Sequence, residues 1–126
     1  MTIVLIDTSV WIHFFSSKNS DHISDQLEEL IDENQAAMCG IVEMELLHGL
    51  RPSEQKKVMS LLSALPFLDA TRETCQIAGK LLHSLREKGV TVPATDSLIA
   101  AIAIQSNCPL MTLDANFNHF QVKIVK

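Results

Sequence analysis

Apolar positions along this chain form short continuous runs that are separated by longer stretches of helical spacing. Aliphatic runs at residues 3–6, 36–39, 67–69, 110–112 and 122–125 predict short strands, since strands of a parallel sheet are buried on both faces. Between these runs, apolar residues recur every three or four positions, as in helices that bury one stripe. Strands that alternate with helices predict an α/β sandwich around a parallel sheet.

Residues that start and stop helices divide the remaining chain. Thr8 or Ser9 is expected to cap a first helix and Ser53 a fourth, because short hydroxyl side chains accept hydrogen bonds from free backbone N–H groups. Thr71 should begin a long helix that Gly89 stops. The other expected helices cover about residues 20–33, 41–50 and 96–105.

Length and composition fit one folded domain over residues 1–126. Hydrophobic residues make up 47% of the chain, which is typical of a globular protein and too high for a disordered one. The longest apolar run, residues 98–104, is far shorter than the roughly 20 residues that span a bilayer. The first residues also lack the basic segment and cleavage site of a signal peptide. We therefore expect a cytoplasmic protein with no membrane association.

The cysteines also favour the cytoplasm. Cys39, Cys75 and Cys108 are odd in number, widely spaced and in apolar surroundings, and no CxxC motif is present. This pattern predicts reduced thiols in the core rather than disulfides or a metal site.

The formal net charge of −5 argues against a protein that coats nucleic acid through bulk electrostatics. It does not exclude an enzyme that acts on nucleic acid. A cluster of catalytic carboxylates would itself contribute several negative charges, and a bound divalent cation would neutralise part of them.

Four acidic residues occupy positions at which an α/β sheet binds ligands. Asp7 and Asp114 each follow a predicted strand, and ligands of open α/β sheets bind at the carboxyl ends of the strands. If the first and fourth strands are neighbours, these two carboxylates meet. Asp96 lies in the first turn of its helix, where the helix dipole favours an anion. Glu45 lies on the helix that follows the second strand.

Clustered carboxylates repel one another, and a hard cation removes that repulsion. Mg²⁺ and Mn²⁺ prefer oxygen ligands, and Mg²⁺ keeps several of its waters. Such an ion can activate water and stabilise the oxygens of an in-line phosphoryl displacement. The pattern thus favours metal-dependent hydrolysis, with Asp7, Asp96 and Asp114 as metal ligands and Glu45 as a further catalytic acid.

Each of these acids also has a purely structural explanation. An Asp after a strand can form a turn or cap a helix, Asp96 can serve only the helix dipole, and Glu45 can be a solvated helix residue. Spacing by itself leaves both interpretations open.

The local sequence around the acids narrows the choice. Four motifs occur in order: Asp7-Thr8-Ser9-Val10-Trp11-Ile12, Glu45-Leu46-Leu47-His48-Gly49, Asp96-Ser97-Leu98-Ile99-Ala100-Ala101-Ile102-Ala103 and Thr112-Leu113-Asp114-Ala115-Asn116-Phe117. In this order and at this length, they resemble the PIN-domain ribonucleases, specifically the VapC-type toxins of bacterial toxin–antitoxin pairs. The resemblance covers nearly the whole chain.

The resemblance implies a compact α/β/α sandwich with a short central parallel sheet. It implies Mg²⁺- or Mn²⁺-dependent cleavage of single-stranded or loop RNA, a cognate antitoxin and a homodimer. Carried over by position, the family's acids are Asp7, Glu45, Asp96 and Asp114. Its hydroxyl positions are Thr8, Ser9 and Thr112, whose expected role is to hydrogen-bond the ligand carboxylates.

One position departs from the family pattern. Many relatives have an acid two residues after the last motif Asp, where this chain has Asn116. An amide oxygen can contact a metal but carries no charge, which puts a second tightly held ion in doubt. The densest basic stretch, Arg51, Lys56 and Lys57, is either a solvated helix face or a contact for the RNA backbone.

Three alternative functions remain. An aspartyl phosphatase also has an Asp after the first strand but usually a second acid two residues later, where this chain has Ser9. A receiver domain of a two-component system would need a further acid beside Asp7 and a Lys after a late strand. A PIN-fold binding or regulatory module without strong catalysis is the third alternative, although all four acids are present.

Overall fold

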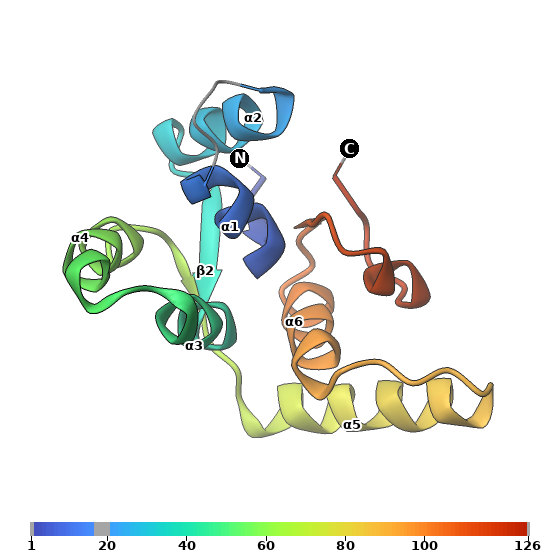
Figure 1. Ribbon diagram of the computed structural model, residues 1–126. Helices are drawn as coiled ribbons and strands as arrows, with labels where there is room; N and C mark the ends of the chain where they lie inside the picture. The colour runs from blue at the N-terminus through green and yellow to red at the C-terminus, as the bar shows by residue number, and fades with distance from the viewer. Residues whose placement is uncertain (1, 17–20, 126) are drawn as a thin grey trace.

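A short parallel sheet lies at the centre of the molecule in the computed structural model, which describes residues 2–16 and 21–125 (Figure 1). Its strands follow the order β3-β2-β1-β4, and every pair is parallel. The first and fourth strands are therefore neighbours, as the site prediction required. The strands are β1 (Val4–Ile6), β2 (Ala36–Cys39), β3 (Phe67–Leu68) and β4 (Leu110–Met111).

Helices connect and cover these strands. Helix α5 runs across one end of α6, and the two pack closely together (Figure 1). The helices are α1 (Thr8–Ser16), α2 (His22–Asp32), α3 (Gly40–Gly49), α4 (Pro52–Leu62), α5 (Arg72–Glu87) and α6 (Ala94–Gln105), followed by the short 3₁₀ helix η1 (Ala115–His119).

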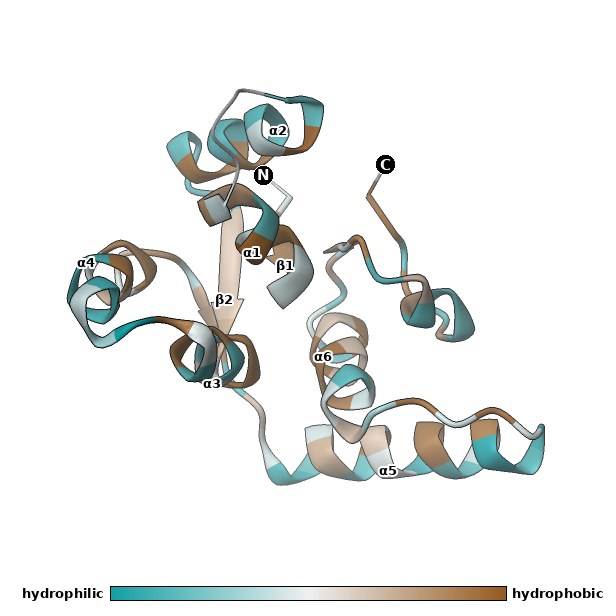
Figure 2. Cartoon of the chain, viewed as in Figure 1, coloured by the Kyte–Doolittle hydropathy of each residue, from teal (hydrophilic) through white to brown (hydrophobic). Residues whose placement is uncertain are grey.

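The core lies on both faces of the sheet. All residues of β1, β2 and β4 are buried, and because successive side chains of a strand point to opposite faces, both faces must be covered. Helix α6 is apolar around most of its surface and is largely buried, whereas α2 and α5 alternate between apolar and polar residues (Figure 2). The prediction of an α/β sandwich around a parallel sheet is confirmed.

Helix α5 has the ends that the sequence predicts. Thr71 is its N-cap, with its hydroxyl oxygen accepting a hydrogen bond from the Thr74 backbone N–H at 3.3 Å. Gly89, just beyond its C-terminus, has φ of +79°, a backbone conformation that glycine adopts without a steric penalty.

Several expected boundaries are wrong. Residues 122–125 form no strand and make a single β-bridge, between Ile124 and Leu110. Helix α4 begins at Pro52 rather than after a Ser53 cap, because proline has no N–H to satisfy in the first turn of a helix. Helix α6 begins at Ala94, with Pro93 at its N-cap, and thus starts two residues before Asp96.

One of the three cysteines is not in the core. Cys39 is buried and Cys108 partly buried, but Cys75 is exposed, and all three thiols are free. The neighbouring Thr74 is fully buried instead, because the inward stripe of α5 passes through position 74 and not through position 75. Within the described part of the chain, no helix combines the length and hydropathy needed to cross a membrane.

Candidate active site

The four predicted acids come together at the carboxyl edge of the sheet. Asp7 directly follows β1, and its backbone N–H donates to the Met111 carbonyl of β4 at 2.9 Å. Asp114 lies three residues beyond Met111, at the N-cap of η1. Glu45 lies on α3, directly after β2, and Asp96 lies in the first turn of α6. Four separate segments of the chain therefore supply one carboxylate each.

Two hydroxyl groups hold the carboxylate of Asp7, which is only 4% exposed. Ser9 Oγ donates to Asp7 Oδ2 at 2.7 Å, and Thr112 Oγ1 donates to the same oxygen at 2.8 Å. Hydrogen bonds to an ionised acceptor are among the strongest in proteins, so they offset the cost of burying this group. Both of these bonds go to Oδ2, which leaves Oδ1 for a ligand.

The same hydroxyls also accept hydrogen bonds from the turn after β4. Ser9 Oγ accepts from the Leu113 backbone N–H at 3.0 Å, and Thr112 Oγ1 accepts from the Asp114 N–H, also at 3.0 Å. The first turn of α1 and the segment after β4 are thus bonded to each other through the Asp7 carboxylate.

Glu45 is attached to the site by the third predicted hydroxyl. Thr8 Oγ1 donates to Glu45 Oε1 at 2.7 Å, across 37 positions of sequence. This bond joins the N-terminus of α1 to α3 and leaves Glu45 Oε2 outside this contact. Neither Thr8 nor Ser9 is the N-cap, contrary to the expectation, because α1 already begins at Thr8 and both residues lie inside its first turn.

Asn116 joins the remaining two acids. Its backbone N–H donates to Asp114 Oδ1 at 2.9 Å, and its side-chain Nδ2 lies 3.4 Å from Asp96 Oδ2. The amide that replaces the acid of many relatives therefore faces Asp96 with its donor group. In each of the four carboxylates, these contacts engage one named oxygen.

Burial and the neighbouring acids together raise the pKa of Asp96. Burial raises the pKa of its carboxyl, and the charges of Asp114, Asp7 and Glu45 raise it further, whereas the hydrogen bond from Asn116 acts in the opposite direction. Burial also raises the pKa of the neighbouring Cys39 thiol to about 11, with smaller contributions from Asp7 and Glu45. The site therefore concentrates negative charge and holds no thiolate at neutral pH.

The donor set fits a hard cation that retains water. Within residues 2–16 and 21–125, no three His, Cys, Asp or Glu side chains lie close enough together to coordinate one metal ion as they stand. A structural Zn²⁺ ion would require such a closed set. Mg²⁺ usually takes only one or two carboxylates and completes its octahedron with waters and substrate phosphates. Carboxylates with one oxygen left for a ligand match that requirement.

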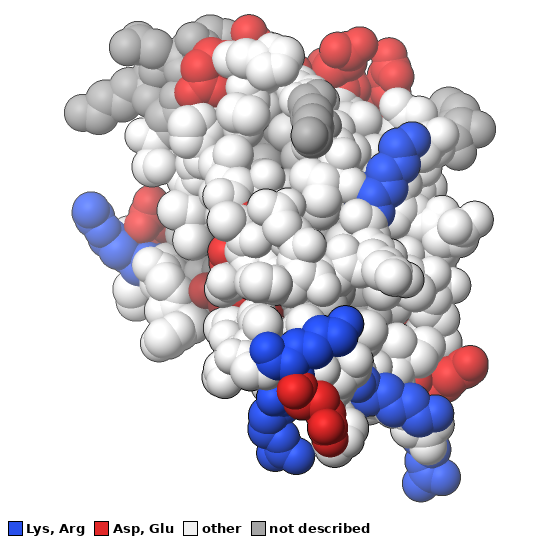
Figure 3. All heavy atoms as spheres, turned by 90° about the vertical axis from the view of Figure 1, so that its right-hand side faces the viewer, with Lys and Arg blue, Asp and Glu red and all other residues white. Residues whose placement is uncertain are grey.

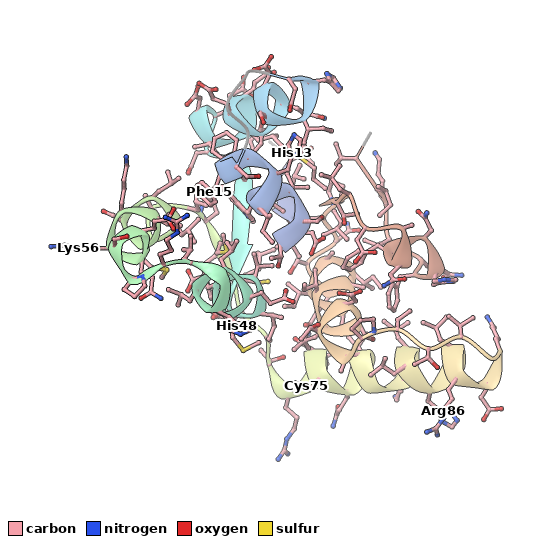
Figure 4. All side chains as sticks on the ribbon, in the orientation of Figure 1. His13, Phe15, His48, Lys56, Cys75 and Arg86 are labelled. Atoms are coloured by element: carbon pink, nitrogen blue, oxygen red, sulfur yellow. The ribbon has the colours of Figure 1, made fainter. Side chains whose placement is uncertain are left out.

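The basic residues that the sequence offered as RNA contacts lie outside this group. Arg51 is the N-cap of α4 and lies 3.7 Å from Glu54, while Lys56 and Lys57 are exposed on α4. Lys56 lies on α4, well apart from α6, which carries Asp96 (Figure 4). The structure therefore does not bring these side chains to the carboxylates.

One positioning residue escaped the sequence analysis. Ser97 is fully buried, and its hydroxyl donates to the Ala78 carbonyl of α5 at 2.8 Å. This bond fixes the first turn of α6, which carries Asp96. A serine at the start of an otherwise apolar helix was the available signal.

Comparison with known proteins identifies a family for the chain. The model of the PIN domain matches residues 4–123. Ribonuclease VapC2 of Rickettsia felis is 31% identical over 115 residues, which cover 87% of this chain and 85% of that protein. Ribonuclease VapC11 of Mycobacterium tuberculosis is 32% identical over 120 residues, or 91% and 89% of the two chains.

A solved structure has the same fold. A chain in the crystal structure of VapBC2 from Rickettsia felis, bound to a DNA fragment from their promoter, superposes with a TM-score of 0.82. The two chains are 28% identical, and the match covers 98% of each.

Proposed function

The chain belongs to the PIN domain family, within its VapC group, and we propose that it is a divalent-metal-dependent endoribonuclease that acts as the toxin of a toxin–antitoxin pair. The observation that carries this proposal is the gathering of four carboxylates from four segments at one sheet edge, each with an oxygen left for a ligand. The names of the relatives support RNA as the substrate.

We assign the binding of Mg²⁺ or Mn²⁺ to Asp7, Asp96 and Asp114, of which one or two would contact the ion directly and the others through its waters. Such an ion, when bound, neutralises phosphate charge and makes water a better nucleophile near neutral pH. The hydroxyls of Ser9 and Thr112 fix the orientation of Asp7, and outer contacts of this kind commonly change metal affinity or activity by about 10- to 100-fold. Asn116 hydrogen-bonds Asp114 and Asp96 in the same way and would fix the orientation of both carboxylates.

We assign Glu45 the role of general base. Its Oε1 accepts from Thr8, so Oε2 can accept a proton from the attacking water. Water then forms the new bond to phosphorus as the bond to the leaving ribose oxygen breaks, which yields one phosphate monoester and one hydroxyl end. A general base contributes about 10²- to 10⁴-fold to such reactions.

The environment of Asp7 does not favour an aspartyl phosphatase. That chemistry usually employs a second acid two residues after the nucleophile, and here Ser9 occupies the position and donates to Asp7. A carboxylate whose oxygen accepts two hydrogen bonds is also a weaker nucleophile, since both bonds stabilise its charge.

A groove between α1 and α4 is where we propose that an antitoxin binds. Solved relatives are complexes named VapBC. The groove has a volume of about 1070 Å³ and is lined by Phe15, Leu50, Val58 and Leu61, with Lys56 and Lys57 among its polar residues. An amphipathic segment that places apolar side chains in such a groove and acids beside the lysines would match it.

We infer further that the protein is cytoplasmic and forms a homodimer. The homodimer is what the resemblance to VapC-type toxins implies. Light scattering at micromolar concentration should give twice the mass of one chain, and a monomer alone would contradict this part.

Cleavage of a mixture of short RNAs by the purified protein tests the proposal. Products should accumulate in Mg²⁺ or Mn²⁺ and cease when a chelator is in excess, whereas para-nitrophenyl phosphate should stay intact. Full RNA cleavage in excess chelator would refute the metal role. Hydrolysis of para-nitrophenyl phosphate without RNA cleavage would favour a phosphatase.

A further inference from the structure

The segments that carry the carboxylates contain no Lys or Arg. The ten Lys and Arg residues occupy positions 18, 51, 56, 57, 72, 80, 86, 88, 123 and 126. None lies in the segments that carry the site, residues 2–16, 36–49 and 94–120. On the face shown in Figure 3, the basic side chains gather mainly toward the lower end, at the height of α5. These three described segments therefore supply none of the cations with which most proteins bind nucleic acid backbones.

Several of these segments instead carry exposed apolar side chains. The large hydrophobic residues with high exposure are Ile12 (56%), Met44 (53%), Leu113 (49%) and Phe67 (47%). The first three lie on segments that carry site residues, and we call them the apolar rim. Met44 directly precedes Glu45 on α3, and Leu113 stands between Thr112 and Asp114.

Hydrogen bonds and helix geometry fix two members of the rim near the acids. The Leu113 backbone N–H donates to Ser9 Oγ, which in turn donates to Asp7. Ile12 follows Ser9 by three positions on α1 and shares its helix face, and side chains of a helix lean toward its N-terminus. Leu113 and Ile12 therefore lie beside the carboxylates, and Met44 lies on the helix that carries Glu45.

We propose that the apolar rim of Ile12, Met44 and Leu113 binds the nucleobases that flank the scissile phosphate of single-stranded RNA. This inference rests on the proposed ribonuclease function. When a phosphodiester lies at the carboxylates, its neighbouring bases must lie at their border. Unpaired bases that are splayed out bury their faces against protein side chains. Bases therefore supply the affinity that basic residues provide elsewhere.

Binding and cleavage of two matched strands test this proposal. The probes are a fluorescent 12-nucleotide oligouridylate and an abasic ribose-phosphate strand of the same length and charge. Anisotropy in Mg²⁺ should show tighter binding of oligouridylate by the wild-type protein. Leu113→Ala, Ile12→Ala and Met44→Ala should each weaken that binding by about three- to tenfold, as expected for losing part of an apolar contact, and should leave the abasic strand unaffected.

Phe67→Ala is the matched control, because Phe67 is similarly exposed but lies on β3, at the opposite edge of the sheet from β4. It should leave both affinities unchanged. For an RNA that the wild-type protein cuts, rim variants should raise KM and leave kcat within about twofold, as loss of uniform binding predicts. Leu113→Met should restore affinity. The loss should persist at raised salt, since apolar contacts are not screened.

The outcomes separate this inference from the proposed function. If the wild-type protein prefers oligouridylate but cuts no RNA, the base contact holds and the nuclease proposal fails. Equal binding of the two strands by the wild-type protein, or an unchanged preference in all three rim variants, would overturn the base contact. Rim variants that alter only the oligomeric mass would assign this surface to a contact between copies of the chain and would also overturn it.

Discussion

Two hydroxyl groups that donate to one oxygen of Asp7 show how single residues shape this site. Ser9 and Thr112 reach Asp7 Oδ2 from α1 and from the end of β4. Their bonds stabilise a buried charge and also determine which oxygen faces a ligand. Substitutions at the carboxylate and at its partners should therefore have graded effects.

We expect Asp7→Asn to reduce RNA cleavage more than Thr112→Val does. Thr112→Val removes one supporting hydroxyl and should reduce activity by about 10- to 100-fold, whereas Asp7→Asn removes a ligand charge itself. Steady-state cleavage in Mg²⁺ measures both. Thr91→Val, at an exposed position on the loop before α6, is the control and should match the wild-type protein. Near-normal cleavage by Asp7→Asn would show that the site is misplaced.

Asp96 gives a pH-dependent prediction about stability. Burial and the neighbouring acids raise its pKa above the ordinary value of 3.8, so the folded protein holds this proton more tightly than the unfolded chain. The contribution of the Asp96 carboxyl to the free energy of unfolding is therefore lost as the pH rises from the ordinary Asp pKa through the raised pKa of the folded protein. At neutral pH, Asp96→Asn should raise the free energy of unfolding, and the gain should vanish below the ordinary Asp pKa.

Urea unfolding across that pH range, with a chelator present, measures this effect. The exposed Asp69→Asn, placed just after β3, serves as the control. A stabilisation by Asp96→Asn that is constant with pH would mean that the carboxyl charge is not its cause.

At the scale of elements, the packing of α6 on α5 places Asp96. Helix α6 is apolar enough to lie buried beside the sheet, and its first turn is attached to α5 by the Ser97 hydroxyl. Because the sheet runs in the order β3-β2-β1-β4, the turns after β1 and β4 lie side by side, opposite that first turn.

Ser97→Ala should destabilise the protein by about 1 kcal/mol, the usual net value of a buried hydrogen bond. Thermal or urea unfolding measures the loss. Ser106→Ala, at the exposed C-cap of the same helix, should change stability by less than about 0.5 kcal/mol. Equal effects of the two substitutions would show that the Ser97–Ala78 bond contributes nothing.

At the scale of the whole molecule, a cluster of carboxylates in a chain of net charge −5 offers a way to inhibit the enzyme. An arginine has a planar donor fork that pairs with carboxylates through two hydrogen bonds. A basic tail of an antitoxin could thus neutralise Asp7, Asp96 and Asp114 in place of a cation. The groove between α1 and α4 would hold the rest of such a partner.

Inhibition by an arginine-bearing antitoxin peptide should therefore weaken as the Mg²⁺ concentration rises, because the two cations compete for the same acids. It should also weaken at high salt, which screens the exposed part of the contact. Titration with the peptide, and with an Arg→Ala version, at several Mg²⁺ concentrations measures this competition. Equal inhibition by both peptides at every Mg²⁺ concentration would instead indicate steric blocking of RNA.

Local sequence determined the fold class and the identity of the acids. Continuous aliphatic runs can be buried only as strands or core helices, so β1 and β2 were predicted almost residue for residue. Thr71 and Gly89 marked the ends of α5 because caps act within a few residues. The positions of Asp7 and Asp114 after strands made them candidates, and the four motifs of the family resemblance selected them from the other acids.

Tertiary structure alone decided how these parts combine. The strand order placed Asp7 beside the turn after β4, and the bond from Thr8 to Glu45 spans 37 positions, a distance over which local patterns carry no information. The exposure of Cys75 depended on which face of α5 packs against the core, and residues 122–125 pair with β4 only at Leu110, through the bridge at Ile124. Thr8 donates to Glu45 and not to a residue near it in sequence, because only the folded chain brings that carboxylate within reach.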